Sequence, residues 1–133
     1  MKKNFDVGLL LLRVTVALLM LLHGISKIKG GVGGIETAMV KNGLPAFVAY
    51  GVYIGEIIAP ILMIIGWRTR IASLLVFFTM IVAVYVAHPT DVLKLNDHGA
   101  SAIELQLLFG IGALALFFMG AGKYALSSKN KWD

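Results

Sequence analysis

Four long apolar blocks dominate the chain, and short polar segments separate them. We predict helices over residues 7–28, 46–67, 71–88 and 100–119. Each block is about 20 residues long, the length that an α-helix needs to cross the hydrocarbon core of a bilayer. The pattern predicts an all-α fold, a four-transmembrane-helix bundle that forms a single integral membrane domain over residues 1–133.

The first block carries three basic residues among its leucines and valines, in LLLLRVTVALLMLLHGISK. A helix turns by about 100° per residue, so relative to Arg13 the side chains of His23 and Lys27 fall at about 280° and about 320°. The three basic residues share one stripe, and Gly24 lies beside it. Polar groups on a membrane helix face other helices and not lipid. We therefore expect the other helices to cover this stripe and to supply its counter-charges.

The second block places Glu56 at its centre and Pro60 one turn later. Pro60 has no N–H group, so the carbonyl of Glu56 loses its usual helical partner. An acid at the middle of a bilayer costs on the order of 2.5–3.5 kcal/mol on insertion scales. We therefore expect Glu56 to have either a functional role or an essential structural partner.

Depth along antiparallel helices predicts which charges meet. His23 and Glu56 differ in depth by roughly 7 Å, and their side chains lean toward each other because helical side chains lean toward their own N-terminus. We expect a hydrogen bond between His23 and Glu56, direct or through one water. Lys27 and Glu104 lie at similar depth and are expected to pair. Arg13 is expected either to bend toward Glu56 or to extend to the lipid headgroups.

The connecting segments predict the remaining elements and the orientation. Residues 35–41 are expected to form a short helix on the membrane surface, which Gly43 ends before Pro45 opens the next helix. Basic residues gather on the cytoplasmic side of membrane proteins. One side of the predicted bundle holds seven, and the other holds Lys29, Lys41 and Lys94. The seven are Lys2, Lys3, Arg68, Arg70, Lys123, Lys129 and Lys131. This asymmetry predicts that both termini are cytoplasmic.

Composition supports a membrane protein and excludes several other classes. The chain is 59% hydrophobic and 14% charged, with a mean hydropathy of +0.87, whereas a soluble domain is about 45–50% apolar and about 25% charged. The net charge is +5, but the basic residues are scattered among apolar blocks, so we expect no nucleic-acid binding. The chain has no cysteine, which excludes disulfides, thiolate metal sites and a thiol relay. The first apolar block is too long for a signal peptide, and we expect it to be retained.

The ordered set of polar and glycine positions resembles the DoxX family of small bacterial and archaeal membrane proteins, over about residues 9–126. The set consists of Arg13, His23-Gly24-x-x-Lys27, Gly43-Leu44-Pro45, Glu56 and Gly66-x-x-Thr69-Arg70, with His88 and Glu104 fitting the later part. The resemblance implies a four-helix protein of the cytoplasmic membrane that is linked to respiratory or redox chemistry. The namesake of the family is similar to a subunit of a thiosulfate:quinone oxidoreductase.

A subunit of a quinone-linked oxidoreductase is our first hypothesis for the function. A quinone needs an apolar slot and a few polar groups that bind its carbonyls and move protons. We expect His23, Glu56 and Tyr53 to contact the quinone, with Lys27 as a further candidate. The sequence shows no electron carrier, so a redox partner subunit with a flavin, haem or other centre is required. Whether the chain is itself catalytic stays open.

Two other functions are compatible with the same residues. Buried acids and histidines also form proton relays, so a small proton-coupled transporter, as a homodimer, is one alternative. A non-catalytic membrane scaffold, whose charged stripe locks the bundle and docks a partner, is the other. His23 and His88 on different helices are far from sufficient for haem ligation, and we expect no metal site. The candidate polar cluster of the bundle is Arg13, His23, Lys27, Glu56, His88 and Glu104.

Overall fold

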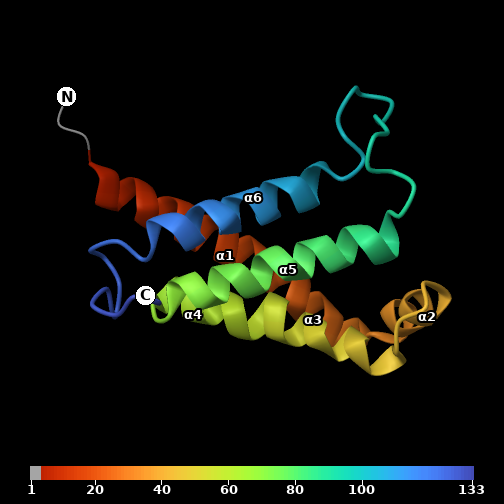
Figure 1. The fold of residues 1–133 in the computed structure, drawn as a ribbon, viewed down its shortest axis with the longest axis horizontal. Coiled ribbons are helices and arrows are strands. Elements are labelled where there is room, and N and C mark those ends of the chain that lie inside the picture. The colour runs from red at the N-terminus through yellow and green to blue at the C-terminus, as the bar shows by residue number, and fades with distance from the viewer. Residues whose placement is uncertain (1–3) are drawn as a thin grey trace.

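The computed structural model describes residues 4–133, and these residues form helices and connecting loops without a β-strand (Figure 1). Lys2 and Lys3, which contribute to the predicted orientation, lie outside the described residues. The elements are α1 (Phe5–Gly30), α2 (Gly33–Lys41), η1 (Ala46–Tyr50), α3 (Gly51–Tyr53), η2 (Ile54–Ile58), α4 (Ala59–Ile65), α5 (Thr69–Ala87) and α6 (Glu104–Met119). The predicted all-α fold is confirmed.

Three helical stretches are long and apolar enough to cross a membrane. They are α1, the continuous stretch Ala46–Ile65 from η1 to α4, and α5. The fourth predicted block forms α6, which is apolar but has only 16 residues. Each apolar block of the sequence therefore contains a helix, and the ends differ from the predicted ones by up to four residues at the start of α6.

α1, the stretch that ends in α4, α5 and α6 form a bundle around one apolar core. α1 packs against α4 and α6, and α5 packs against the same two helices from the opposite side (Figure 1). Met20, Met63, Val76 and Leu116, one from each of these helices, are fully buried at the centre. Many large aliphatic side chains on the outer faces of the helices are exposed, as expected where lipid replaces water.

The predicted short helix between the first two apolar blocks is confirmed as α2. It begins two residues before the predicted start and ends at Lys41 as predicted. Gly43, with φ of 78°, ends it in the left-handed region that favours glycine, and Pro45 directly precedes η1. Met39 is buried and belongs to a second apolar cluster with Val86 of α5. α2 thus covers one end of the groove between α5 and the α3–η2 stretch.

The second long helical stretch changes its hydrogen-bonding pattern around Glu56. Residues Ile54–Ile58 form a π-helical turn in which the N–H of Ala59 donates to the carbonyl of Ile54. Pro60 lacks the N–H that a regular α-helix would use to bond the carbonyl of Glu56. Single π-turns inside α-helices occur frequently at functional sites, and this one carries the acid that the sequence singled out.

Residues 120–133 fold back onto the bundle. The N–H groups of Leu126 and Ser127 donate to the carbonyls of Ile65 and Gly66 at 3.0 and 3.1 Å. The N–H of Arg70 donates to the carbonyl of Trp132 at 3.2 Å. The C-terminal segment is therefore attached to the turn between α4 and α5.

Candidate functional site: an ion pair at an apolar cavity

Lys27 and Glu56 form an ion pair inside the bundle. Lys27 Nζ lies 2.5 Å from Glu56 Oε2, and the side chains are 26% and 5% exposed. Lys27 is in the last turn of α1, and Glu56 is in the π-turn η2. Hydrogen bonds between charged groups are stronger than neutral ones, and the low dielectric of an apolar environment strengthens them further.

Gly24 determines how closely the two helical stretches approach. A Cβ atom at Gly24 would overlap the carbonyl oxygen of Glu56, so only glycine fits this contact. Lys27 follows three residues later on the same side of α1, and its side chain leans back toward the N-terminus. This lean carries the ammonium group to Glu56. Tyr53 adds a second link, because its hydroxyl donates to the carbonyl of Lys27 at 3.3 Å.

A cavity of about 500 Å³ lies beside the ion pair. Its walls come from α2, from the η1–α3–η2 stretch and from α5, and only three lining residues have polar side chains: Lys27, Glu56 and Thr79. Representative apolar lining residues are Ile35, Met39, Val52, Leu75, Phe78 and Val82. Ligand sites typically measure about 300–1,000 Å³ and combine apolar walls with a few polar groups. The cavity has the size and composition of such a site.

One side of the cavity is open to the outer surface of the bundle. Ile54 and Phe78 line the cavity and are also largely exposed. In a membrane this outer surface contacts acyl chains. A second, smaller hollow of about 210 Å³ lies between α5 and α6, and Gln106 is the only lining residue there with a polar side chain. Of these two cavities, the larger one combines an apolar wall with charged groups.

The predicted Lys27–Glu104 pair is wrong, and the predicted His23–Glu56 hydrogen bond is not found in its direct form. Among residues 4–133, the carboxylate of Glu56 pairs with Lys27, so Lys27 does not pair with Glu104, and no hydrogen bond joins His23 to Glu56. The ring of His23 instead packs edge-on against Phe109 of α6, with ring centroids 5.8 Å apart. The predicted pairs follow from depth along the helix, whereas the direction in which each side chain points around the helix decides the contact. Gly24 and Lys27 face η2, whereas His23 faces α6.

Arg13 lies at the other end of the bundle and does not reach Glu56. It is only 1% exposed, which makes it more buried than Glu56. Its Nη1 and Nη2 atoms donate to the carbonyls of Ala121 and Tyr124 at 2.5 Å each. Arg13 therefore neither bends toward Glu56 nor extends to headgroups, and both predicted alternatives are wrong. It holds the C-terminal segment instead.

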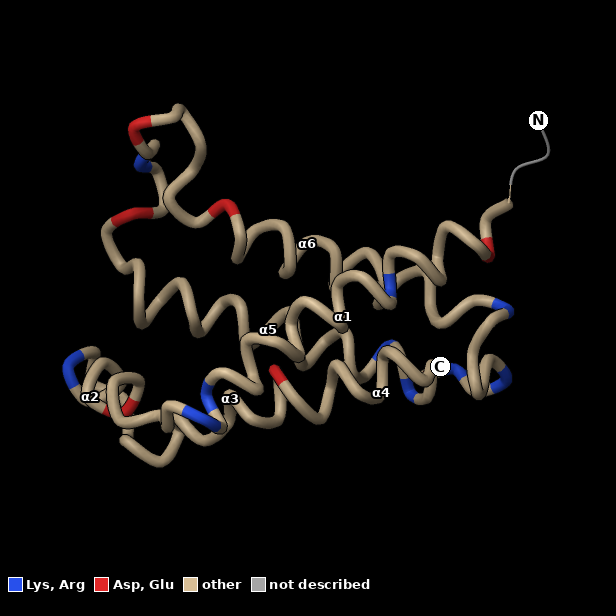
Figure 2. Tube along the Cα trace, turned by 180° about the vertical axis from the view of Figure 1, so that it is seen from behind, with Lys and Arg blue, Asp and Glu red and all other residues tan. Residues whose placement is uncertain are grey.

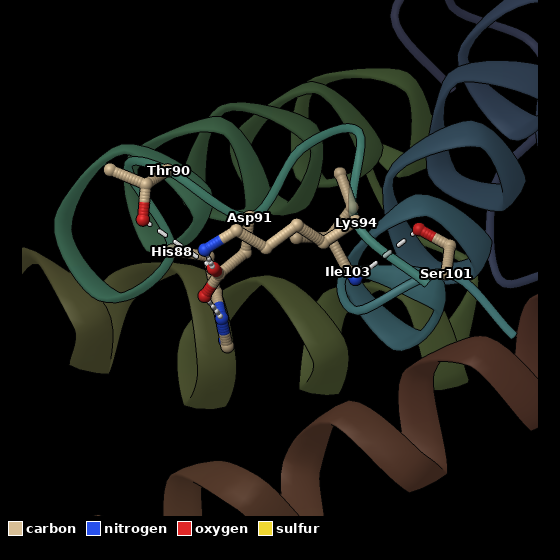
Figure 3. Close-up of polar contacts among 6 residues, drawn as sticks. All are labelled: His88, Thr90, Asp91, Lys94, Ser101 and Ile103. Carbon is tan, nitrogen blue, oxygen red and sulfur yellow. Dashed lines mark hydrogen bonds and ion pairs between the residues drawn. The ribbon is translucent and has the colours of Figure 1, made fainter. Parts of the chain in front are cut away.

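His88 and Glu104 lie outside the cavity. His88 follows α5, and its Nδ1 is 3.4 Å from Asp91 Oδ2, while Lys94 Nζ is 2.9 Å from Asp91 Oδ1 (Figure 3). Lys94, and after it His88, hold the pKa of Asp91 below its ordinary value. Glu104 is exposed at the start of α6. The structure thus brings together Lys27 and Glu56, and none of the other four candidates lines the cavity.

Comparison with known proteins identifies the family. A family model described as DoxX matches residues 8–89, from the first turns of α1 to the end of α5. The chain belongs to the DoxX family. The match includes both partners of the ion pair and every residue that lines the large cavity. With its long apolar helices, this DoxX protein is an integral membrane protein.

Two relatives extend the similarity beyond α5. A protein of Bacillus subtilis (strain 168) named "Putative oxidoreductase CatD" is 39% identical over 116 residues, which are 87% of this chain and 83% of that protein. An "Uncharacterized protein" of Haemophilus influenzae (strain ATCC 51907 / DSM 11121 / KW20 / Rd) is 33% identical over 125 residues, 89% of this chain and 87% of that protein. No solved structure matches the chain significantly.

Proposed function

We propose that this DoxX protein is a subunit of a quinone-linked membrane oxidoreductase and that it binds the quinone ring in the large cavity. The observation that carries the proposal is the position of the Lys27–Glu56 pair in the wall of an otherwise apolar cavity of about 500 Å³. A quinone combines an apolar ring and tail with two carbonyl oxygens. It therefore matches both the apolar walls and the hydrogen-bond donor at Lys27.

The ion pair supplies the groups that quinone reduction needs from the protein. Reduction to the quinol takes up two electrons and two protons. The ammonium of Lys27 donates a hydrogen bond to a quinone carbonyl and stabilises the negative charge that develops on this oxygen. Glu56 accepts a proton and passes it to the same oxygen, and the second proton comes from solvent to the other quinone oxygen. The electrons come from a redox centre of a partner subunit, such as a flavin or a haem.

Thr79 is the third polar group in the cavity. Its hydroxyl donates to the carbonyl of Leu75 at 2.8 Å, which leaves oxygen lone pairs for an O–H group of the quinol. A Cβ atom at Gly55 would overlap the Thr79 hydroxyl, so glycine at this position keeps the hydroxyl at the cavity wall. The predicted contacts with His23 and Tyr53 are replaced by Lys27 and Thr79 in this proposal, and Glu56 is retained.

The name of the Bacillus subtilis relative supports redox chemistry, since it describes an oxidoreductase. The distribution of charges supports the membrane arrangement. We propose a multi-pass protein of the cytoplasmic membrane with four spans, in which α6 and the residues before it form the last span. Both termini face the cytoplasm in this arrangement, on the side with the larger number of basic loop residues.

Quinone titration in lipid nanodiscs tests the proposal. Purified protein is titrated with menaquinone and ubiquinone analogues, alongside the variants Lys27→Met and Glu56→Gln. Glu104→Gln is the matched control, because Glu104 is exposed on α6 and lies outside the cavity. We expect saturable binding that weakens by at least about tenfold in Lys27→Met, since a hydrogen bond to a charged group contributes about 1.5–3 kcal/mol. Equal affinity in all four proteins would contradict the proposal.

A further inference from the structure

A second surface, at the opposite end of the bundle from α2, combines basic and aromatic side chains. We call it the basic surface and define it as Arg68 and Arg70 together with three lysines of the C-terminal segment, Lys123, Lys129 and Lys131. The backbone hydrogen bonds between residues 65–70 and 126–132 join these positions, which are far apart in the sequence. Figure 2 shows blue segments gathered at the end of the bundle where the C-terminus lies.

Within residues 4–133, the basic surface keeps an excess of positive charge. The ion pairs found in residues 4–133 involve Lys27, His88 and Lys94, and none of the five basic residues. The carboxylate of the nearby Asp133 accepts hydrogen bonds from the Ser127 hydroxyl and from the backbone N–H groups of Arg68 and Asn130. Arg70 Nε donates to the main-chain oxygen of Asp133 at 3.1 Å. The single side-chain carboxylate of Asp133 offsets only one of the five positive charges. The basic surface therefore carries a positive potential that attracts an anionic partner.

Two tryptophans lie on the same surface. Trp67 and Trp132 are 45% and 41% exposed, and each lies under a basic group: Arg68 Cζ is 5.9 Å from the Trp67 ring centroid and Lys131 Nζ is 5.3 Å from that of Trp132. The side chain of Leu126, whose backbone N–H donates to the carbonyl of Ile65 in the same part of the bundle, is also exposed. Tryptophan with neighbouring basic groups is typical of protein surfaces at the headgroup level of a bilayer. A soluble acidic partner would not need this apolar component.

The C-terminal segment of the basic surface is fixed by hydrogen bonds with residues that have no part in the proposed quinone chemistry. Arg13 binds the carbonyls of Ala121 and Tyr124 from inside the bundle. Asp6 of α1 accepts a hydrogen bond from the N–H of Lys123 at 3.0 Å. These contacts fix the beginning of the C-terminal segment against α1. The lysines of the segment are therefore presented in a defined position and not on a free tail.

We propose that the basic surface binds the phosphate headgroups of anionic phospholipids, with Trp67 and Trp132 inserted at the boundary between headgroups and acyl chains. Arginine and lysine bind the phosphate oxygens, and the tryptophans bury their rings against the lipid glycerol region. The result is an annulus enriched in anionic lipid around this end of the bundle. The inference is independent of the quinone proposal, because none of its residues lines the large cavity.

The chain offers a direct optical test, because Trp67 and Trp132 are its only tryptophans. The full chain is reconstituted into phosphatidylcholine vesicles that contain a minor fraction of phosphatidylglycerol with brominated acyl chains. A parallel sample contains the same fraction of brominated phosphatidylcholine. Bromine quenches tryptophan fluorescence only at short range, so the ratio of the two quenching efficiencies reports lipid enrichment at the basic surface. We expect phosphatidylglycerol to quench at least about twofold more at low salt, and less so as salt screens the charges.

Two matched triple variants locate the effect. Lys123→Gln/Lys129→Gln/Lys131→Gln removes three lysines of the basic surface, and Lys29→Gln/Lys41→Gln/Lys94→Gln removes three at the opposite end. We expect the first variant to lose at least half of the quenching preference and the second to keep it. Equal quenching by the two brominated lipids in the unaltered protein would overturn the proposal. An equal loss of preference in both variants would overturn it as well.

Discussion

The ammonium of Lys27 and the carboxylate of Glu56 lie 2.5 Å apart, in the wall of a cavity that is otherwise almost entirely apolar. Each charge alone would be expensive in such a place, and together they compensate each other. The same pair fastens α1 to the π-turn of the second helical stretch. The same ion pair therefore stabilises the bundle and presents charged groups to a ligand in the cavity.

A double-mutant cycle separates these contributions. Removing one partner of a buried pair costs on the order of 3–5 kcal/mol, and we expect somewhat less here because Lys27 is partly exposed. Lys27→Met should destabilise more than Glu56→Gln, since it leaves the carboxylate buried without a partner. The double variant should cost less than the sum of the two. Unfolding free energies in mixed micelles measure all three, and strictly additive losses would argue against a coupled pair.

Gly24 provides a test of the close approach between α1 and η2. Gly24→Ala places a Cβ atom against the Glu56 carbonyl, and we expect a loss of about 1–3 kcal/mol, as for other overpacked contacts. Gly8→Ala is the control, because no atom lies within 4 Å of its added Cβ. Thermal unfolding of the two variants should show a lowered midpoint for Gly24→Ala alone. Equal stability of both variants would show that α1 does not touch the π-turn.

Asp133 makes the attachment of the C-terminal segment dependent on pH. The hydrogen bond from Ser127, followed by those from the backbone of Asn130 and Arg68, holds the pKa of Asp133 below the ordinary 3.8. A lowered pKa means that the stabilisation is complete above pH 3.8 and is lost as the pH falls through the lowered value. In a Trp67→Phe background, the fluorescence anisotropy of Trp132 should drop over this acidic range.

The variant Asp133→Asn serves as the reference for this titration. It should show the low anisotropy already at pH 7 and should respond little to further acidification. If Asp133→Asn and the parent protein have the same anisotropy at pH 7, the carboxylate does not hold the segment.

The proposed orientation is accessible to labelling, because the chain has no native cysteine. Cysteines introduced at Asn42 and Asn96 should react with an impermeant thiol reagent added to intact cells. One introduced at Ser128 should react only after the membrane is opened. Labelling of Ser128→Cys in intact cells, without labelling of the other two, would reverse the orientation.

The helical segments could be predicted because their signals are local. Blocks of about 20 apolar residues define the long helices, and Gly43 and Pro45 mark the end of α2 and the start of η1 as expected. Glu56 was recognisable as a site residue because an isolated acid in an apolar block is costly unless it has a function or an ion-pair partner. Pro60 indicated an irregular backbone at the same place, and the π-turn is the form that this irregularity takes.

The pairing of the charges could not be predicted from depth alone. His23 and Lys27 are one turn apart on α1, and both reach the depth of Glu56. The contact at Gly24 rotates α1 so that Lys27 faces η2 and His23 faces Phe109. The partner of Arg13 was equally hidden, because it consists of backbone carbonyls 108 and 111 residues away. Every residue carries a backbone carbonyl, so the sequence does not indicate which carbonyls accept hydrogen bonds from Arg13.

Photolabelling with an azido-quinone tests the central claim most directly. The protein in nanodiscs is illuminated with the labelled quinone, with and without an excess of unlabelled quinone, and the modified peptides are identified by mass spectrometry. We predict competable labelling of the cavity walls in residues 48–56 and 75–87, with strongly reduced labelling in Lys27→Met. Labelling that is not displaced by excess quinone, or that falls mainly on residues 103–111 at the smaller hollow between α5 and α6, would contradict the account.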